Sequence, residues 1–152
     1  MDRLKRILLV EDCVNDIELT LDALTEHHLA NEVVVVRDGE EALDYLYRRG
    51  IFRLRAGGQP VVVLLDVKLP KVDGLEVLER IKKDEVLKTV PVVMLTSSRE
   101  EKDLVRSYDL GANAYVVKPV EFGDFVTAIK EIGLFWAVIN QPPPMASIAG
   151  TE

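Results

Sequence analysis

The chain has 152 residues, of which 48% are hydrophobic and 30% charged, a composition that fits one globular domain and argues against wholesale disorder. Its 26 acidic and 19 basic residues give a formal net charge of −7, which argues against binding to duplex DNA, because neutralising phosphates takes a concentrated basic face. The single cysteine, Cys13, cannot form an intrachain disulfide, and no apolar run approaches the roughly 18 to 20 residues of a membrane span. We therefore expect a cytoplasmic protein with neither nucleic-acid nor membrane partners.

Short apolar runs alternate with segments whose apolar residues have helical spacing. The runs are β-branched or apolar throughout, which is typical of strands covered on both faces of a parallel sheet. In chain order we predict strand 7–10, helix 17–24, strand 33–36, helix 39–46, strand 61–65, helix 75–81, strand 92–95, helix 104–108, strand 114–117 and helix 122–132. This alternation predicts an α/β fold, a five-stranded doubly wound parallel sheet of (βα)5 type with right-handed crossovers.

Two segments lie outside this alternation. Residues 48–60 are longer than an ordinary connection and contain four arginines, so we expect an exposed loop after the second helix. Three consecutive prolines at 142–144 end regular structure, which predicts one domain over residues 1–140 and a mobile tail over residues 141–152.

Polar residues that could bind ligands or take part in a reaction follow four of the predicted strands. Glu11 and Asp12 follow the first, Asp66 the third, Thr96 the fourth and Lys118 the fifth. We expect them to converge, because the functional crevice of such sheets lies at the carboxyl ends of the strands. Three carboxylates repel one another unless a cation compensates, and Mg²⁺ suits such ligands. One carboxylate beside the ion could attack phosphorus, while the lysine and the hydroxyl could bind phosphoryl oxygens.

The motifs around these residues resemble the receiver domain of two-component response regulators. The likeness runs from about residue 5 to residue 139 and implies a flavodoxin-like receiver fold with strand order 2-1-3-4-5. The motifs stand in the family's order at receiver-like separations: Val10-Glu11-Asp12, Leu65-Asp66-Val67-Lys68-Leu69-Pro70 with Asp73-Gly74, Leu95-Thr96-Ser97 and Gly111-Ala112-Asn113-Ala114-Tyr115-Val116-Val117-Lys118-Pro119.

The resemblance implies that Asp66 accepts a phosphoryl group from a sensor histidine kinase. It also implies that Mg²⁺ is held by Glu11, Asp12, Asp66 and the backbone carbonyl of Lys68. The protein would then be a signalling phosphoacceptor and not an enzyme, apart from catalysing its own phosphotransfer and dephosphorylation.

The same resemblance assigns roles around the phosphorylation site. Thr96 would be the switch hydroxyl, Tyr115 the switch aromatic and Lys118 the phosphate-binding lysine, and the peptide bond from Lys118 to Pro119 would be cis. The alternative for Tyr115 is an ordinary core residue.

Other functions with related chemistry can be compared with the sequence. It contains neither a P-loop nor a G-x-G-x-x-G motif, and Lys68 stands where aspartyl-phosphate phosphatases have a second aspartate. The arginine-rich segment and the end of the chain look like the single-domain regulators paired with bacterial phytochrome kinases. A relay intermediate that passes phosphate from Asp66 to a histidine phosphotransfer protein stays open as an alternative.

The last predicted helix is followed without a polar stripe by Leu134, Phe135, Trp136, Val138 and Ile139, so we expect it to continue through them. A helix that becomes apolar around its circumference needs a second burial surface. We therefore expect a homodimer, strengthened by phosphorylation, through the face formed by the fourth helix, fifth strand and fifth helix. The expected interface residues are Leu104, Tyr108, Phe135 and Trp136. Alternatively, Phe135 and Trp136 fold back onto their own domain.

Overall fold

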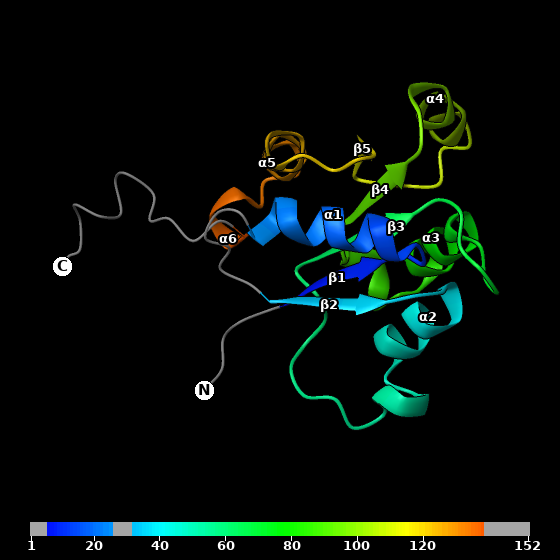
Figure 1. The fold of residues 1–152 in the computed structure, drawn as a ribbon. Helices are drawn as coiled ribbons and strands as arrows, with labels where there is room; N and C mark the ends of the chain where they lie inside the picture. Colours follow the sequence, from blue (N-terminus) through cyan, green and yellow to red (C-terminus); the bar gives the residue numbers. More distant parts are fainter. Residues whose placement is uncertain (1–5, 26–31, 139–152) are drawn as a thin grey trace.

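The computed structural model describes residues 6–25 and 32–138, and these form a parallel sheet with helices on both faces (Figure 1). The strand order is β2-β1-β3-β4-β5, which confirms the predicted fold. The strands are β1 (Ile7–Val10), β2 (Val33–Val36), β3 (Val62–Asp66), β4 (Val92–Thr96) and β5 (Ala114–Val117).

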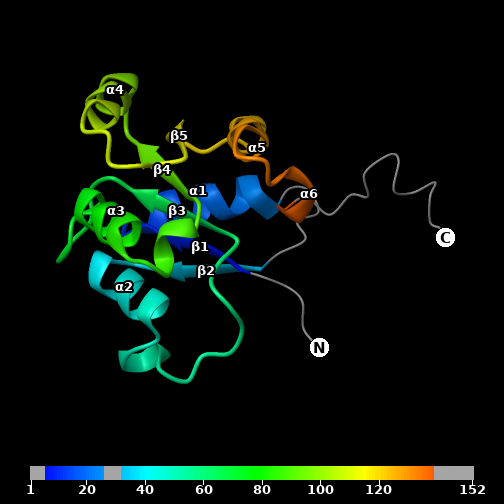
Figure 2. The same ribbon diagram turned by 180° about the vertical axis from the view of Figure 1, so that it is seen from behind.

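Helices follow the strands in the expected alternation, and Figure 2 shows them from behind. None of the helices in the described part of the chain is long and apolar enough to cross a membrane. They are α1 (Val14–Thr25), α2 (Gly39–Tyr47), α3 (Gly74–Lys83), α4 (Arg99–Ser107), α5 (Phe122–Glu131) and α6 (Phe135–Val138), with short 3₁₀ helices η1 (Gly50–Phe52) and η2 (Leu87–Thr89).

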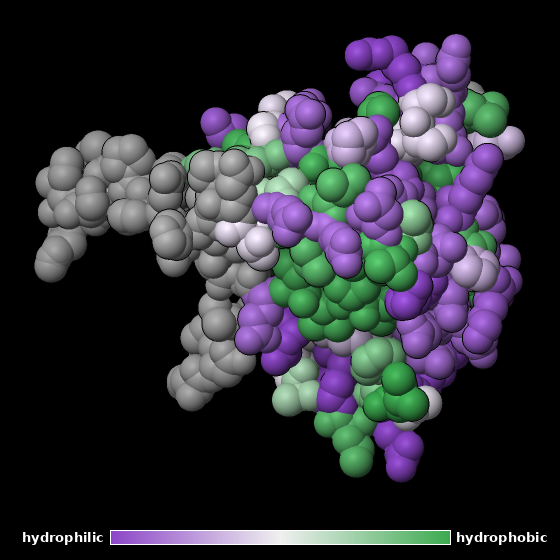
Figure 3. All heavy atoms as spheres, viewed as in Figure 1, coloured by the Kyte–Doolittle hydropathy of each residue, from purple (hydrophilic) through white to green (hydrophobic). Residues whose placement is uncertain are grey.

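Two apolar cores lie on opposite faces of the sheet, because successive strand side chains point to opposite sides. In β1, Leu8 and Val10 belong to the core covered by α2 and α3, and Ile7 and Leu9 to the core covered by α1 and α5. All four β1 residues are buried, whereas the edge strand β2 is buried only at Val36. Figure 3 shows hydrophobic surface on the face where α1 lies beside β2.

Gly74 allows α3 to begin directly against the strand end that carries Asp66. A Cβ atom at this position would lie 2.0 Å from the Asp66 carbonyl oxygen and 2.6 Å from that of Val67. Asp73 caps the same helix, since its side chain accepts a hydrogen bond from the backbone N–H of Leu75. The Asp73-Gly74 motif thus fixes the connection that leaves the candidate site.

The arginine-rich segment 48–60 is mostly exposed, as expected, but side-chain hydrogen bonds to its backbone hold it in a defined conformation. Arg55 donates hydrogen bonds to the carbonyl of Tyr45 (2.7 Å), the carbonyl of Gly58 (3.0 Å) and Oε1 of Gln59 (3.0 Å). Its guanidinium also lies 4.0 Å from the centre of the Tyr45 ring. Arg48 adds donors to the carbonyls of Arg55 and Gly57.

The expectation of one continuous last helix is wrong. Helix α5 ends at Glu131, the backbone turns at Gly133, where φ is +77°, and α6 begins at Phe135. Val138 is fully buried in the core under α1 and α5, and Phe135 packs against that core. The predicted tail, residues 141–152, and the side chain of Trp136 lie outside the described residues.

Candidate functional site

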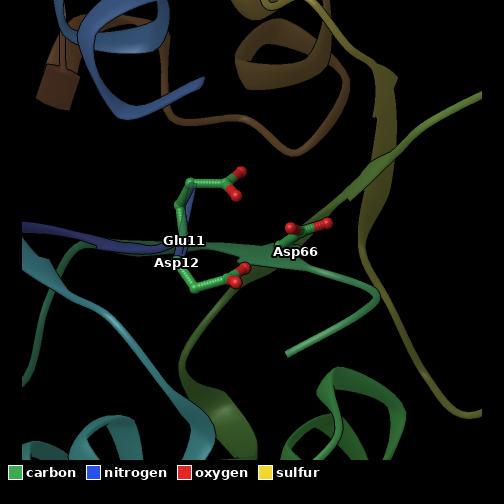
Figure 4. A group of neighbouring side chains, drawn as sticks. All are labelled: Glu11, Asp12 and Asp66. Atoms are coloured by element: carbon green, nitrogen blue, oxygen red, sulfur yellow. The ribbon is translucent and has the colours of Figure 1, made fainter. Parts of the chain in front are cut away.

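Three carboxylates meet at the carboxyl ends of β1 and β3, as the sequence predicts. One oxygen from each of Glu11, Asp12 and Asp66 lies within 4.8 Å of the other two (Figure 4). The cause is topological: β1 and β3 are neighbours, Glu11 and Asp12 directly follow β1, and Asp66 is the last residue of β3. The side chains of Glu11 and Asp66 are only 1% and 8% exposed.

Lys118 reaches into this cluster from the end of β5. Its Nζ lies 3.1 Å from Oε1 of Glu11, 3.1 Å from Oδ2 of Asp66 and 3.1 Å from Oδ2 of Asp16. The backbone N–H of Lys118 donates to the carbonyl of Thr96 (2.7 Å), and the peptide bond to Pro119 is cis, as expected. The ammonium thus partly compensates the buried negative charge.

The electrostatics of the site follow from this arrangement. Burial, together with the negative charge of Glu11, raises the pKa of Asp66 from 3.8 to about 7, although Lys118 acts in the opposite direction. Burial lowers the pKa of Lys118, but its hydrogen bond to Asp16 and the charges of Asp66 and Glu11 outweigh this and raise it above the ordinary value. Lys118 is therefore a permanent cation, and Asp66 is a carboxyl group that a nearby cation would help to ionise.

Thr96, the last residue of β4, is fully buried beside Asp66. Its register partner is Val117 of β5, and the neighbouring Leu95 pairs with Asp66 of β3. Its Oγ1 has no hydrogen-bond partner among the residues that the structure describes. Because a buried unpaired hydroxyl costs free energy, this atom is a strong candidate to bind an oxygen of a ligand on Asp66.

Tyr115 lies on β5 and is half-buried, and the guanidinium of Arg106 lies 5.5 Å from the centre of its ring. It forms part of the floor of an open groove of about 520 Å³ between α4 and α5. Basic residues of α4 line one wall of the groove, and Asp124 and Glu131 of α5 are among the residues opposite. Tyr115 thus lies on β5, next to the strand that ends in Thr96, and its side chain reaches the molecular surface.

The structure does not bring the predicted interface residues together. Leu104 and Tyr108 are exposed on and just after α4, whereas Phe135 belongs to α6, and both ribbon views place α4 and α6 far apart on opposite sides of α5 (Figures 1 and 2). The four residues therefore do not form one continuous face, and their part in an interface stays a prediction.

Sequence reasoning missed two residues of the site. Asp16 lies in the first turn of α1 and holds Lys118, and Arg37 donates through one guanidinium nitrogen to the carbonyl of Asp12 (2.9 Å). The only signal for Asp16 was an acidic residue one helical turn after Asp12, which ordinarily indicates a helix start. The contact of Asp16 depends on the path of the chain after β1, and that of Arg37 on its path after β2.

The donor set fits a hard divalent cation, since every group is a carboxylate oxygen. In Glu11, Oε1 binds Lys118 and Oε2 accepts from the backbone N–H of Cys13 (3.2 Å). Asp12 and Asp66 are therefore better placed to coordinate the ion directly. Glu11 is better placed to add negative charge near the ion without binding it. The Lys68 side chain is exposed, 3.9 Å from Oε2 of Glu101, and the role of its carbonyl stays a prediction.

Comparisons with known proteins point to one family. A family model described as the response regulator receiver domain matches residues 7–130. FilR2 of Methanothrix harundinacea, a probable methanogenesis regulatory protein, is 42% identical over 140 residues, 90% of this chain and 86% of FilR2. The response regulator Rcp1 of Synechocystis sp. is 39% identical over 132 residues, 87% of this chain and 88% of Rcp1.

Solved structures agree with these relatives. The bacteriophytochrome response regulator AtBRR is 64% identical with a TM-score of 0.87, covering 92% of this chain and all of that one. The Mn²⁺-bound form of Rcp1 is 37% identical with a TM-score of 0.70, covering 91% and 99% of the two chains. The phosphorylated cyanobacterial phytochrome response regulator RcpA is 43% identical with a TM-score of 0.70, covering 88% and 94%.

Proposed function

The chain belongs to the family of response regulator receiver domains of two-component signalling, and on this footing we propose that Asp66 is its phosphoacceptor. One observation carries the proposal: Asp66 is the carboxylate that lies between the other acidic residues, the ammonium of Lys118 and the neighbouring strand that ends in Thr96. No other carboxylate of the described site shares all three neighbours.

The geometry supports direct transfer of a phosphoryl group to Asp66. A carboxylate oxygen of Asp66 forms a bond to phosphorus while the bond from phosphorus to a histidine nitrogen of the kinase breaks, so that Asp66 carries an acyl phosphate and the histidine is freed. Lys118 donates a hydrogen bond to one phosphoryl oxygen, and the buried hydroxyl of Thr96 donates to another. Bound Mg²⁺, held by Asp12 and Asp66 with Glu11 nearby, would supply the charge neutralisation that the transfer needs.

The phosphoryl group would also operate a switch. A new hydrogen bond to Thr96 would draw that residue toward Asp66 and leave room for Tyr115 to turn inward, which biases two conformations of the α4–β5–α5 face. We propose this face as the output surface and as the place where two copies associate. Exposed Leu104 belongs to α4, and exposed Tyr108 directly follows that helix.

The kinase partner that we propose is a phytochrome histidine kinase. AtBRR and RcpA, which resemble this chain over most of its length, are by name phytochrome response regulators. The comparisons do not favour the relay alternative. The free and exposed Cys13 suits a reducing compartment, and we place the protein in the cytoplasm on that ground.

Phosphorylation by a small phosphodonor tests this function. The full chain is incubated with acetyl phosphate in Mg²⁺ buffer, and the intact mass is measured. We expect one added phosphoryl group that is lost on treatment with hydroxylamine and absent when a chelator replaces Mg²⁺. Asp66→Asn should show none. Label that persists on the Asp66→Asn variant would show that another residue is the acceptor.

A further inference from the structure

Asp16 is a fourth carboxylate at the site, and its place differs from that of the other three. Its oxygens are not among those that could share a metal ion with Glu11, Asp12 and Asp66. Instead, its Oδ2 accepts a hydrogen bond from Lys118 at 3.1 Å. The two residues are 102 positions apart, so this contact ties the start of α1 to the end of β5.

The contact with Asp16 satisfies one of the three donors of Lys118. An ammonium group has three N–H donors and no acceptor, and the structure gives it three carboxylate partners at equal distance. A phosphoryl group on Asp66 needs one of those donors. The donor that Asp66 itself releases is the natural one, because it already points at the reacting carboxylate, while Glu11 and Asp16 keep the other two.

Burial shows what Asp16 adds to Glu11. The side chain of Glu11 is 1% exposed and holds Lys118 from inside the site, whereas that of Asp16 is 30% exposed and holds it from the mouth. Without Asp16, the ammonium would keep only its two inner partners and pair more closely with Asp66. It would then compete for the carboxylate that must attack phosphorus.

We propose that Asp16 is a positioning residue, which holds the Lys118 ammonium where it meets an incoming phosphoryl group. This inference rests on the function proposed above. It makes the first turn of α1 a working part of the site, in addition to the electrostatic support that any acidic residue gives a helix start.

A double-mutant cycle with Lys118 tests the inference. Asp16→Ala, Asp16→Asn and Asp16→Glu are prepared in wild-type and Lys118→Ala backgrounds, and the initial rate of phosphorylation by acetyl phosphate is measured in Mg²⁺. Asp22→Ala is the matched control, since Asp22 is an exposed aspartate of the same helix. Where the Lys118→Ala background reacts too slowly, the cycle uses the affinity for beryllofluoride, which mimics a phosphoryl group.

We expect Asp16→Ala to slow phosphorylation by about threefold to tenfold, the effect of one partly exposed charge-assisted hydrogen bond. Asp16→Asn should be intermediate, Asp16→Glu should restore most of the rate, and Asp22→Ala should match wild type. In the Lys118→Ala background the Asp16→Ala effect should disappear, because the two residues act together. Mg²⁺ affinity, measured by calorimetry, should stay within about twofold of wild type, since Asp16 is not a ligand.

Three results would overturn the inference: a rate unchanged or raised by Asp16→Ala, an equal loss in the Lys118→Ala background, or a loss of Mg²⁺ affinity that explains the slower rate. Failure of the proposed function looks different, because the wild-type chain itself would then take no phosphoryl group at Asp66.

Discussion

The unusual pKa of Asp66 links the stability of the protein to pH. Between pH 3.8 and about 7 the folded state keeps a proton on Asp66 that the unfolded state releases, so the free energy of unfolding falls as pH rises through this range. The cause is burial of a carboxylate beside Glu11. A cation at the cluster would relieve the same repulsion.

Replacing Asp66 by Asn should therefore stabilise the protein, and only at the higher pH. In urea unfolding with a chelator present, the variant should match wild type near pH 4 and exceed it at pH 8 by about 4 kcal/mol, the linkage value of a pKa raised from 3.8 to about 7. Mg²⁺ should raise the stability of wild type more than that of the variant. A difference between the two proteins that is the same at both pH values would contradict the electrostatic explanation.

Thr96 should couple phosphorylation to the surface without being required for it. Thr96→Ala removes a buried hydroxyl that has no partner within the described structure, so we expect no loss of folding stability. The variant should still bind beryllofluoride in Mg²⁺, but the changes in amide NMR shifts that we expect on α4 and β5 of the wild type should be largely absent. A variant that reproduces those shifts would show that the switch does not pass through Thr96. Thr96→Ser, which keeps the hydroxyl, is the control.

At the scale of elements, segment 48–60 depends on one side chain. Arg55 joins the end of α2 to Gly58 and Gln59 and lies over the ring of Tyr45. Arg55→Ala removes the hydrogen bonds to the carbonyls of Tyr45 and Gly58 and to Oε1 of Gln59, and it takes the guanidinium away from the ring. We expect a decrease of about 1–3 kcal/mol in the free energy of unfolding.

Arg53→Ala is the matched control in the same segment. The side chain of Arg53 donates a long hydrogen bond, 3.4 Å, to the carbonyl of Gly50, so its removal should leave the free energy of unfolding close to that of wild type. Urea unfolding measures both variants. Equal effects of Arg53→Ala and Arg55→Ala would contradict the role of Arg55.

The helices and strands show how much of the fold could be predicted from the sequence. Apolar runs predicted all five strands, but β3 and β4 each extend one residue further, to Asp66 and Thr96, because backbone pairing continues under a polar side chain. The break between α5 and α6 was missed, since hydrophobicity continues across it and only Gly133 marks the turn. Contacts such as those of Asp16 and Arg37 depend on loop geometry, which periodicity does not encode.

At the scale of the whole molecule, the proposed association of two copies would use the groove between α4 and α5. One wall carries the basic residues of α4 and the other the acidic residues of α5, so a twofold axis could place opposite charges against each other. Switching of Tyr115 in its floor would reshape the contact.

Sedimentation of the protein with and without beryllofluoride measures this association. We expect a shift toward dimer with beryllofluoride, and Leu104→Glu should abolish it, because a charge at this exposed position of α4 would be desolvated in the contact without a partner. Leu54→Glu, at the 87% exposed Leu54 of segment 48–60, is the control and should still dimerise. A wild type that stays monomeric in both states at micromolar concentration would refute the dimer.

Among several neighbouring carboxylates, Asp66 is the one that we expect to carry the phosphoryl group. Borohydride reduces an acyl phosphate to an alcohol and so converts a phosphorylated aspartate to homoserine, which peptide mass spectrometry locates in the sequence. After phosphorylation in Mg²⁺, we predict homoserine at position 66 and at neither position 12 nor position 16, and no 5-hydroxynorvaline at position 11, the product that a phosphorylated glutamate would give. Homoserine at position 12 or 16, or an aspartate at 66 unchanged in protein that demonstrably carries phosphate, would contradict the account.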